Sequence, residues 1–332
     1  MRSPAVDADE RFMARAIELA RRGEGHTRPN PAVGAVVVKG GRIIGEGWHR
    51  RAGGDHAEVA ALKDAVRRGH SPKGATLYVT LEPCSRPGRV GACTDAIVAA
   101  GVGQVVYGAV DPNPKNRGRA ARVLAKSGVE CGKFPDARRG TSGVNERLAS
   151  LIAPFAKHVR TGLPYVTVKI AMSLDGRICD RFGEARWVSS AQARKKTGKL
   201  RERVDAIMVG AETVRRDDPS LLSHGKRNDD LVRVVVSRSG KLPKTAQVFT
   251  DGRNPTLVYR DAREALADLG RRGLMHVLCE GGLKLATSLA KAGLVDEWIA
   301  VLAPKVLGSG RMADATLIGN VRCLPDWQPS LR

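Results

Sequence analysis

The sequence predicts an α/β protein of two domains, on three observations. Its 332 residues, 42% of them hydrophobic, are enough to build two separate cores. Short apolar runs rich in Val and Ile alternate with amphipathic segments of helical period, a pattern typical of a largely parallel sheet with helices on both faces. A polar stretch interrupts this alternation and ends at residues 161–164, after which a new strand starts. We therefore expect one domain at residues 1–150 and a second at residues 160–332.

The elements expected in the first domain follow from periodicity and from turn residues. Asp7 is the candidate cap of a helix over residues 10–23, and a hairpin over residues 31–49 turns at Gly40 and Gly41. Helices are then expected at residues 56–69, 93–101 and 117–128, and strands at residues 75–83, 102–111 and 129–132.

The second domain repeats the alternation. Its first strand is expected at residues 164–173. Further strands are expected near residues 205–210, 231–237, 256–259, 275–279 and 296–302, and helices near residues 190–203, 261–271 and 283–292. This order again predicts a parallel sheet covered by helices.

Composition excludes some classes of protein and leaves others open. The formal charge of +22 fits a nucleic-acid partner, pockets for phosphorylated small molecules, or a solvated basic surface. Because the basic residues come as scattered pairs, we favour the solvated surface and expect no nucleic-acid partner. No apolar run reaches the roughly 20 residues of a membrane helix, and the start lacks the layout of a signal peptide. We expect a cytoplasmic protein with no membrane partner, and the sequence leaves a homo-oligomer open.

The sharpest chemical signal is a group of metal-ligand residues at strand ends and helix starts. His56 opens one expected helix, Cys84 ends an expected strand and Cys93 opens the next helix. One imidazole and two thiolates leave the fourth position of a tetrahedral Zn²⁺ free for water, and helix N-termini favour the thiolate form. The other cysteines show no disulfide-framework spacing. A buried histidine with two unrelated core cysteines is the alternative, but the combined pattern favours zinc.

Glu58, two residues after His56, is the candidate catalytic residue. Two thiolates neutralise the charge of Zn²⁺, so its bound water is less acidic than at an all-histidine site and a carboxylate must help to move the proton. This arrangement is the signature of zinc deaminases, in which the glutamate is the acid/base and not a ligand. That signature usually ends Pro-Cys-x-x-Cys, whereas residues 85–92 separate the two cysteines here. Two interpretations fit Arg86 and Arg89 in this insertion. They bind a substrate phosphate, or they belong to an ordinary solvated turn.

The second half carries a weaker signal. No Gly-x-Gly-x-x-Gly follows a strand, so the usual dinucleotide fingerprint is missing. Glu280-Gly281-Gly282 lies between an apolar strand and a helix. The glycines would let a phosphate approach the helix N-terminus, or they form a tight strand-to-helix turn.

Taken together, these motifs resemble the bifunctional deaminase/reductase family of riboflavin biosynthesis. In the first half the resemblance rests on residues 28–34 (RPNPAVG), 45–49 (GEGWH), 52–58 (AGGDHAE), 79–85 (VTLEPCS), 88–89 (GR), Cys93 and 111–114 (DPNP). In the second half it rests on residues 168–177 (VKIAMSLDGR), 186–190 (RWVSS), 211–221 (AETVRRDDPSL), 233–236 (RVVV), 279–282 (CEGG), 292–297 (AGLVDE) and 303–308 (APKVLG). It implies an N-terminal cytidine-deaminase-like α/β/α domain followed by a dihydrofolate-reductase-like α/β domain.

The resemblance also implies a two-step activity and its residues. The first step is zinc-dependent deamination of 2,5-diamino-6-ribosylamino-4(3H)-pyrimidinone 5′-phosphate, and the second is reduction of the ribosyl group to ribityl by NADPH. Substrate contacts are implied at Asn30, His49, Arg89, Lys169, Arg201, Leu221 and Glu280. Contacts to NADPH are implied at Ala171, Trp187, Thr213, Asp217, Gly282, Leu283, Lys284, Leu285, Ala286, Thr287 and Ser288. Without the resemblance, Asn30 fits a turn and His49 fits a strand-end histidine equally well.

Departures from the family pattern leave two alternatives open. Ala185 stands where the family commonly has Ser, His224 where it commonly has Arg, and the sequence ends about 20 residues after Gly310, where the family carries closing strands. One alternative is a deaminase with a degenerate, non-catalytic second domain, which protection of that domain by NADPH would exclude. The other is a nucleoside or nucleic-acid deaminase, which salt-dependent binding of tRNA or single-stranded DNA would support.

Overall fold

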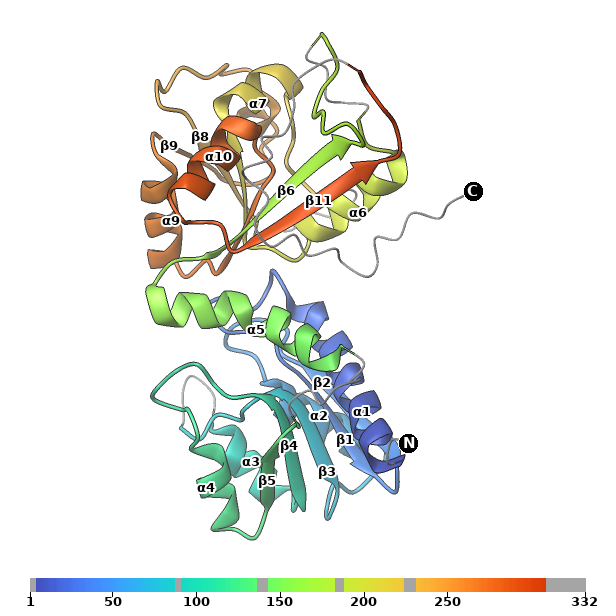
Figure 1. The fold of residues 1–332 in the computed structure, drawn as a ribbon. Helices are drawn as coiled ribbons and strands as arrows, with labels where there is room; N and C mark the ends of the chain where they lie inside the picture. Colours follow the sequence, from blue (N-terminus) through green and yellow to red (C-terminus); the bar gives the residue numbers. More distant parts are fainter. Residues whose placement is uncertain (1–3, 87–90, 136–142, 183–187, 224–230, 309–332) are drawn as a thin grey trace. The chain divides into compact units, whose positions relative to one another are not determined.

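The computed structural model describes residues 4–86, 91–135, 143–182, 188–223 and 231–308. The chain divides into two compact units, Met1–Gly162 and Leu163–Arg332 (Figure 1). Each unit has its own sheet and its own hydrophobic cores, and each is described by itself.

The first unit is built on a five-stranded sheet of order β2-β1-β3-β4-β5. Its strands are β1 (Gly34–Lys39), β2 (Arg42–Trp48), β3 (Thr76–Leu81), β4 (Gln104–Ala109) and β5 (Glu130–Lys133). The expectation of a largely parallel sheet is wrong for this unit, because β1 is antiparallel to both its neighbours and only β3–β4 and β4–β5 are parallel. The cause is the predicted hairpin: Gly40 and Gly41, both at positive φ, reverse the chain, and β1 then lies between two strands of the opposite direction.

Helices cover both faces of this sheet. They are α1 (Pro4–Ala20), α2 (Ala57–Arg67), α3 (Cys93–Ala99), α4 (Ala120–Ala125) and α5 (Val144–Thr161), with a 3₁₀ turn at Arg21–Gly23. Val36 and Val38 of β1 pack with α1 and α5, whereas Ala35 and Val37 pack with α2, α3 and α4. Alternate residues of one strand therefore supply two cores. α1 already begins at Pro4, so Asp7 lies in its first turn and is not its cap.

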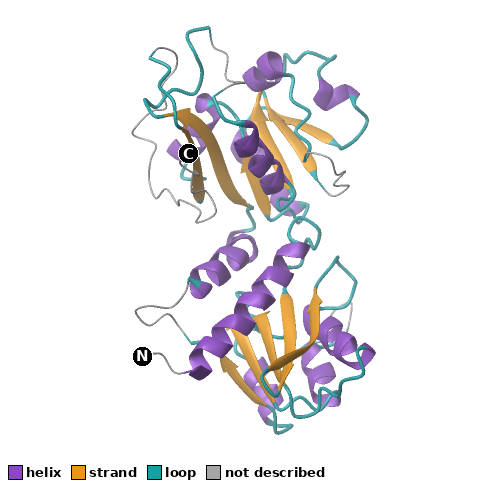
Figure 2. Cartoon of the chain, turned by 90° about the vertical axis from the view of Figure 1, so that its right-hand side faces the viewer, coloured by secondary structure: helices purple, strands orange, loops and turns teal. Residues whose placement is uncertain are grey.

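The second unit is built on a six-stranded sheet of order β11-β6-β10-β7-β8-β9, and every pairing in it is parallel. Its strands are β6 (Tyr165–Ser173), β7 (Ala206–Gly210), β8 (Val232–Val236), β9 (Thr256–Tyr259), β10 (His276–Cys279) and β11 (Glu297–Ala303). Its helices are α6 (Ala191–Arg201), α7 (Ala211–Asp217), α8 (Gln247–Thr250), α9 (Ala262–Arg271) and α10 (Leu283–Lys291). α9 and α10 pack on one face and α6, α7 and α8 on the other, so helices flank the sheet as predicted (Figure 2). The short helices α7 and α8 were not predicted.

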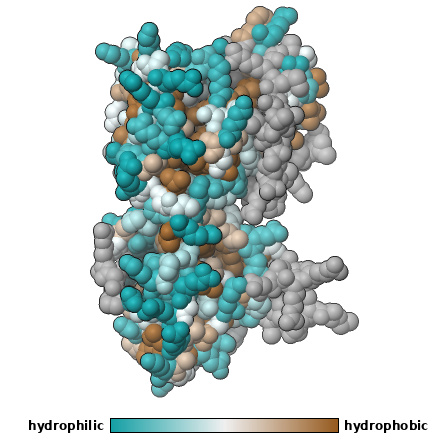
Figure 3. All heavy atoms as spheres, turned by 60° about the vertical axis from the view of Figure 1, so that its left-hand side comes forward, coloured by the Kyte–Doolittle hydropathy of each residue, from teal (hydrophilic) through white to brown (hydrophobic). Residues whose placement is uncertain are grey.

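The surface agrees with the composition. On the face drawn in Figure 3 hydrophilic side chains predominate, and apolar ones lie in small separate patches, as is normal for protein surfaces. Within the described ranges, no helix has both the length and the hydropathy needed to cross a bilayer.

Candidate active sites

The predicted metal ligands lie together where β3 ends and two helices begin. His56 is the N-cap residue of α2, and Glu58 lies in the first turn of that helix. Cys84 follows β3, and Cys93 is the first residue of α3. Backbone N–H groups at a helix start have no partner in the preceding turn, and they stabilise anionic ligands such as thiolates.

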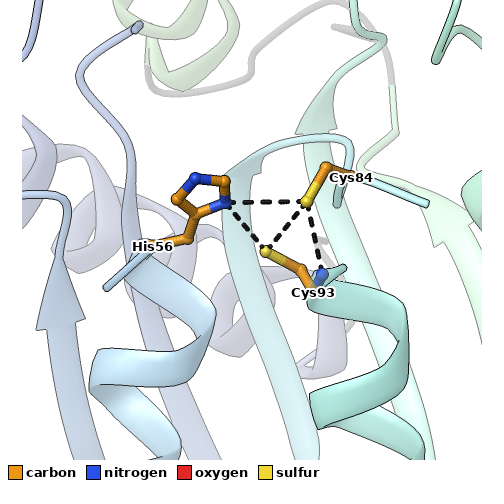
Figure 4. A group of neighbouring side chains, drawn as sticks. All are labelled: His56, Cys84 and Cys93. Carbon is orange, nitrogen blue, oxygen red and sulfur yellow. Dashed lines mark hydrogen bonds between the residues drawn. The ribbon is translucent and has the colours of Figure 1, made fainter. Parts of the chain in front are cut away.

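The three ligand atoms lie close enough together to bind one Zn²⁺, although two of the three distances are shorter than those around a bound ion. Nδ1 of His56 lies 3.1 Å from Sγ of Cys93 and 3.6 Å from Sγ of Cys84, and the two sulfurs are 3.3 Å apart (Figure 4). A tetrahedral ion with Zn–S near 2.3 Å and Zn–N near 2.0 Å separates its ligands by roughly 3.5–3.8 Å. In the part of the chain that the structure describes, this is the one group of three such residues arranged to hold a metal.

Contact between the two cysteines shifts their pKa values in opposite directions. Hydrogen bonds from the Cys93 thiol, from His56 and from the backbone N–H of Cys93 lower the pKa of Cys84 to about 4. Donation to Cys84, together with burial, raises the pKa of Cys93. The two cysteines therefore hold one proton between them. A divalent cation that replaced this proton would neutralise two thiolates.

Glu58 is buried beside this group, with only 4% of its surface exposed. Burial, and then the negative charge of Cys84, raise the pKa of its carboxyl. A carboxyl with a raised pKa accepts and returns a proton more readily near neutral pH. The geometry thus suits Glu58 to the acid/base role that the sequence predicts for it.

Asn30 and His49 form a hydrogen-bonded pair next to the metal group. Nδ2 of Asn30 lies 3.1 Å from Nε2 of His49, and Nδ1 of His49 lies 2.9 Å from the carbonyl oxygen of Asp55. Burial lowers the pKa of His49, so the imidazole is neutral, with Nδ1–H donating to Asp55 and Nε2 accepting from Asn30. The His49 ring lies edge-on to the His56 ring, with centroids 5.3 Å apart. Both candidate substrate contacts therefore adjoin a candidate metal ligand.

The insertion between the cysteines is only partly described. Arg86 is exposed. Arg89 lies outside the described residues, so its contact with a phosphate stays a prediction.

In the second unit a buried carboxylate lies between two basic side chains. Arg201 donates two hydrogen bonds to Glu280, at 2.6 and 3.1 Å, and Nζ of Lys169 lies 3.6 Å from the same carboxylate. Burial by itself would raise the pKa of Glu280, but the charges of Arg201 and Lys169 outweigh it and lower that pKa. Arg201 also donates to the carbonyl of Leu222 at 2.9 Å. The neighbouring Leu221 is buried and has φ 54°, so it would contact a substrate through its backbone.

The candidate NADPH contacts lie along the carboxyl ends of parallel strands. Ala171 is in β6, Thr213 and Asp217 are in α7 directly after β7, and residues 282–288 begin α10 after β10. β10 pairs with both β6 and β7. In parallel α/β sheets, ligands bind outside this edge, and helix N-termini there hold phosphate groups.

Gly281 and Gly282 differ in the space that surrounds them at this edge. A Cβ atom on Gly281 would lie 2.7 Å from Cδ2 of Leu285 and 3.2 Å from the backbone N of Gly210, whereas one on Gly282 would meet no atom within 4 Å. Leu285 and Ala286 belong to the core, so their contacts with a cofactor would come from the backbone. Trp187 and the two departures from the family pattern, Ala185 and His224, lie outside the described residues.

Sequence reasoning missed residues that hold the candidate site residues in place. Asn116 hydrogen-bonds to both neighbours of Cys84. The motif at residues 111–114 pointed to this region but not to a role. Arg233 is 1% exposed and donates at 3.2 Å to the carbonyl of Ser220, next to Leu221. The motif at residues 233–236 included it but gave it no role, because one arginine in an apolar strand is usually read as solvent-facing.

The fold and the site together define a class. A mixed sheet with a His, Cys, Cys group and a buried glutamate, followed by a parallel α/β unit with an open ligand edge, is typical of a zinc-dependent deaminase joined to a second enzyme domain. Residues 6–109 match the cytidine and deoxycytidylate deaminase zinc-binding region, and residues 164–323 match the RibD C-terminal domain. The chain belongs to the RibD family of riboflavin biosynthesis proteins.

Relatives and solved structures support this membership over nearly the whole chain. The riboflavin biosynthesis protein RibD of Escherichia coli is 38% identical over an alignment that covers 94% of this chain and 92% of that protein. RibD of Aquifex aeolicus is 35% identical over 92% of this chain and 89% of its own length. The crystal structure of a deaminase/reductase from Thermotoga maritima, 34% identical, superposes with a TM-score of 0.83 over 97% of this chain and 94% of that one. RibD of Acinetobacter baumannii, also 34% identical, gives a TM-score of 0.76 over 97% and 93%.

These findings confirm several predictions made from the sequence. The two-domain α/β fold class, the family and the combination of a zinc-dependent deaminase with an NADPH-dependent reductase are all confirmed. The roles of individual site residues are not tested by them.

Proposed function

We propose that the first unit hydrolyses an amino group from 2,5-diamino-6-ribosylamino-4(3H)-pyrimidinone 5′-phosphate, and that the second unit then reduces the ribosyl group to ribityl with NADPH. The observation that carries the proposal is the group of His56, Cys84 and Cys93 with Glu58 buried beside it. The Thermotoga maritima protein is a diaminohydroxyphosphoribosylaminopyrimidine deaminase/5-amino-6-(5-phosphoribosylamino)uracil reductase, and this activity, together with the near-complete coverage of the bacterial relatives, supports the choice of substrate.

In the deaminase site, His56, Cys84 and Cys93 would hold zinc through Nδ1 and the two sulfurs. When bound, the metal supplies an activated water as the nucleophile. Glu58 would accept a proton from the nucleophile and deliver it to the amino nitrogen that leaves as ammonia, while the remaining hydroxyl proton passes to the adjacent ring nitrogen. Water and amine thus become carbonyl and ammonia, and the carboxylate is regenerated. The neutral pair of Asn30 and His49 offers fixed hydrogen-bonding groups to orient the pyrimidine ring.

In the reductase site, the basic side chains of Lys169 and Arg201 would face the sugar phosphate. Glu280 holds both of them, because it hydrogen-bonds to Arg201 and lies within 3.6 Å of Lys169. The edge formed by β6, α7 and the start of α10 would bind NADPH, which supplies the hydride for the opened ribose carbonyl. The helix start at Gly282 suits a phosphate of that cofactor.

An assay that resolves the two steps by mass tests this proposal. The substrate is incubated with the zinc-loaded chain, with and without NADPH. We expect loss of the amino group in both samples and gain of two hydrogens only with NADPH. Deamination without any NADPH oxidation would instead show that the second domain is degenerate.

Glu58→Gln tests the role of the carboxylate. The amide cannot accept the proton, so we expect deamination to fall by roughly 100-fold or more, while zinc content and reduction of supplied deaminated intermediate stay unchanged. Metal analysis and the same mass assay measure all three. Near-normal deamination in this variant would assign the proton transfer to another group.

A further inference from the structure

The buried side-chain amide of Asn116 hydrogen-bonds to the residues on both sides of the Cys84 ligand. Nδ2 of Asn116 donates to the carbonyl of Pro83 at 3.4 Å, and Oδ1 of Asn116 accepts from the backbone N–H of Ser85 at 2.9 Å and from its hydroxyl at 3.1 Å. The residues immediately before and after Cys84 are therefore tied to the same side chain. Asn116 is 8% exposed, so water competes little for these bonds.

Asn116 is itself held by a second buried group. Its Nδ2 also donates to Oδ2 of Asp111 at 2.8 Å, and Oδ1 of Asp111 accepts from the backbone N–H of Asn113 at 2.8 Å. Each atom of the Asn116 amide thus faces partners of the opposite kind: donors at the oxygen and acceptors at the nitrogen. Such a fully satisfied buried network has one arrangement.

Glu82 connects this loop to the end of β3. Its carboxylate accepts from the backbone N–H groups of Asp111 at 3.2 Å, Gly118 at 3.0 Å and Ala120 at 3.2 Å, and it is 3% exposed. The segment from residue 111 to residue 120 is therefore hydrogen-bonded to Glu82, which lies two residues before Cys84. On the opposite side, α3 holds Cys84 directly, because the N–H of Thr94 donates to its carbonyl at 3.2 Å and the N–H of Cys93 to its sulfur at 3.2 Å.

We propose that Asn116 is a positioning residue for the zinc ligand Cys84, fixed in turn by Asp111 and Glu82. The proposal rests on the proposed zinc site and gives the motif at residues 111–114 a role within it. α3 sets the distance between the two sulfurs, and Asn116 sets the direction from which the Cys84 sulfur faces the metal. A neutral amide does this without adding charge to a site whose two thiolates already balance Zn²⁺. Outer partners of metal ligands typically change affinity or activity by 10- to 100-fold when removed.

Asn116→Leu in the full-length chain tests the proposal, because it keeps the side-chain volume and removes every hydrogen bond. Zinc release to an excess of a chromogenic chelator should be about 10-fold faster or more than in the parent. In the cobalt-substituted protein, the thiolate-to-cobalt and d–d absorption bands should shift, since they report the angles at the metal. Asn145→Leu is the matched control, because Asn145 lies away from the metal ligands and, among the described residues, donates to the carbonyl of Pro135 near the surface. It should leave both measurements unchanged.

Asn116→Asp provides a second variant should the leucine variant fail to fold. Its carboxylate still accepts from Ser85, but it faces the carboxylate of Asp111 at the place where the amide donated, so we expect zinc release at least as fast as in the leucine variant. Parent-like cobalt spectra and zinc release in the variants, even with a lower melting temperature, would show a merely structural role and overturn the proposal. If the parent chain itself binds no zinc or cobalt at His56, Cys84 and Cys93, the proposed function fails instead.

Discussion

His276 lies in β10 with its imidazole between an aromatic ring and a hydroxyl. Its ring meets that of Tyr165 edge-on at 5.6 Å, and Nε2 lies 2.9 Å from Oγ1 of Thr167. Oγ1 of Thr167 also lies 2.9 Å from Oε2 of Glu297. Because a hydroxyl has one proton and a carboxylate must accept, Thr167 donates to Glu297 and His276 donates from Nε2. The imidazole therefore occupies one neutral tautomer.

This arrangement predicts an acid sensitivity of the second unit. Burial lowers the pKa of His276 to about 3, whereas an unfolded histidine has a pKa near 6.5. Between these values the unfolded chain binds a proton that the folded chain does not, so stability is complete above about pH 6.5 and falls as the pH drops toward 3. The slope from this one group is at most about 1.4 kcal/mol per pH unit.

Urea unfolding between pH 7 and pH 4, followed for the second unit, measures this slope. His276→Gln should flatten it, because the amide does not titrate. His70→Gln, at an exposed position of the first unit, is the control and should leave it unchanged. An unaltered pH dependence in His276→Gln would mean that other groups cause the acid sensitivity.

Residues that bind a metal or move protons could be predicted from the sequence, whereas residues that hold them in position could not. His56, Glu58, Cys84 and Cys93 were predicted from spacing because few residue types bind zinc or move protons. Arg233 gave no such signal, yet it is buried and donates to both oxygens of Asp251, at 2.6 and 2.9 Å. Its partner is close only after the chain has folded, so residue type and local pattern could not identify the pair.

At the scale of elements, two glycines of β2 set the position of the helix that carries the deaminase residues. A Cβ atom on Gly47 would lie 2.3 Å from the backbone N of Ala61 and 2.6 Å from the carbonyl oxygen of Ala57, both in α2. A Cβ atom on Gly45 would lie 2.4 Å from the carbonyl oxygen of Ala61. These contacts are backbone atoms and cannot rotate away, so β2 and α2 touch only because both positions lack a side chain.

Gly47→Ala should therefore move α2 and, with it, His56 and Glu58. We expect a loss of about 1–3 kcal/mol in the stability of the first unit, as for other overpacked cores, with weaker zinc retention and slower deamination. Gly132→Ala is the matched control, since a Cβ on this strand glycine meets no atom within 4 Å. Thermal unfolding and chelator competition compare the two variants. Equal behaviour of both would show that α2 can move without consequence.

Periodicity predicted most of the longer elements, but it missed the 18-residue helix α5, whose region was predicted only as a polar, partly helical stretch, and it failed on the short helices. The strands from β7 to β11 lie within about two residues of their predicted positions, because apolar runs between turn residues mark buried strands clearly. α7 and α8 have only 7 and 4 residues, which is too short for a helical period to show. The direction of β1 relative to its neighbours depends on how the hairpin pairs with the rest of the sheet, and periodicity carries no information on that.

At the scale of the whole chain, each proposed activity draws its described residues from one unit. His56, Glu58, Cys84 and Cys93 belong to Met1–Gly162, and Lys169, Arg201 and Glu280 belong to Leu163–Arg332. Each unit also has its own buried clusters around its own sheet. The sequence predicts a boundary near residue 160, because a new strand begins a second strand-and-helix series there. Most of the polar stretch before it forms α5, which packs in the core of the first unit. We infer that the two reactions are separable and that the deaminated intermediate can pass between chains through solution.

A mixture of two variants, each impaired in one of the two reactions, tests that inference. Glu58→Gln should block deamination alone. Lys169→Met should block or slow reduction alone, because it removes one cation from the sugar-phosphate site but keeps the pair of Arg201 and Glu280. Neither variant by itself should convert the diamino substrate fully, whereas their equimolar mixture with NADPH should form the ribityl product after a lag while the intermediate accumulates. Mass spectrometry over time follows all three species, and each variant alone at doubled concentration is the control.

If the mixture forms no ribityl product although each variant retains its own half-reaction, the intermediate must be handed over within one chain. Loss of both activities in either folded variant would show that the two units share a site.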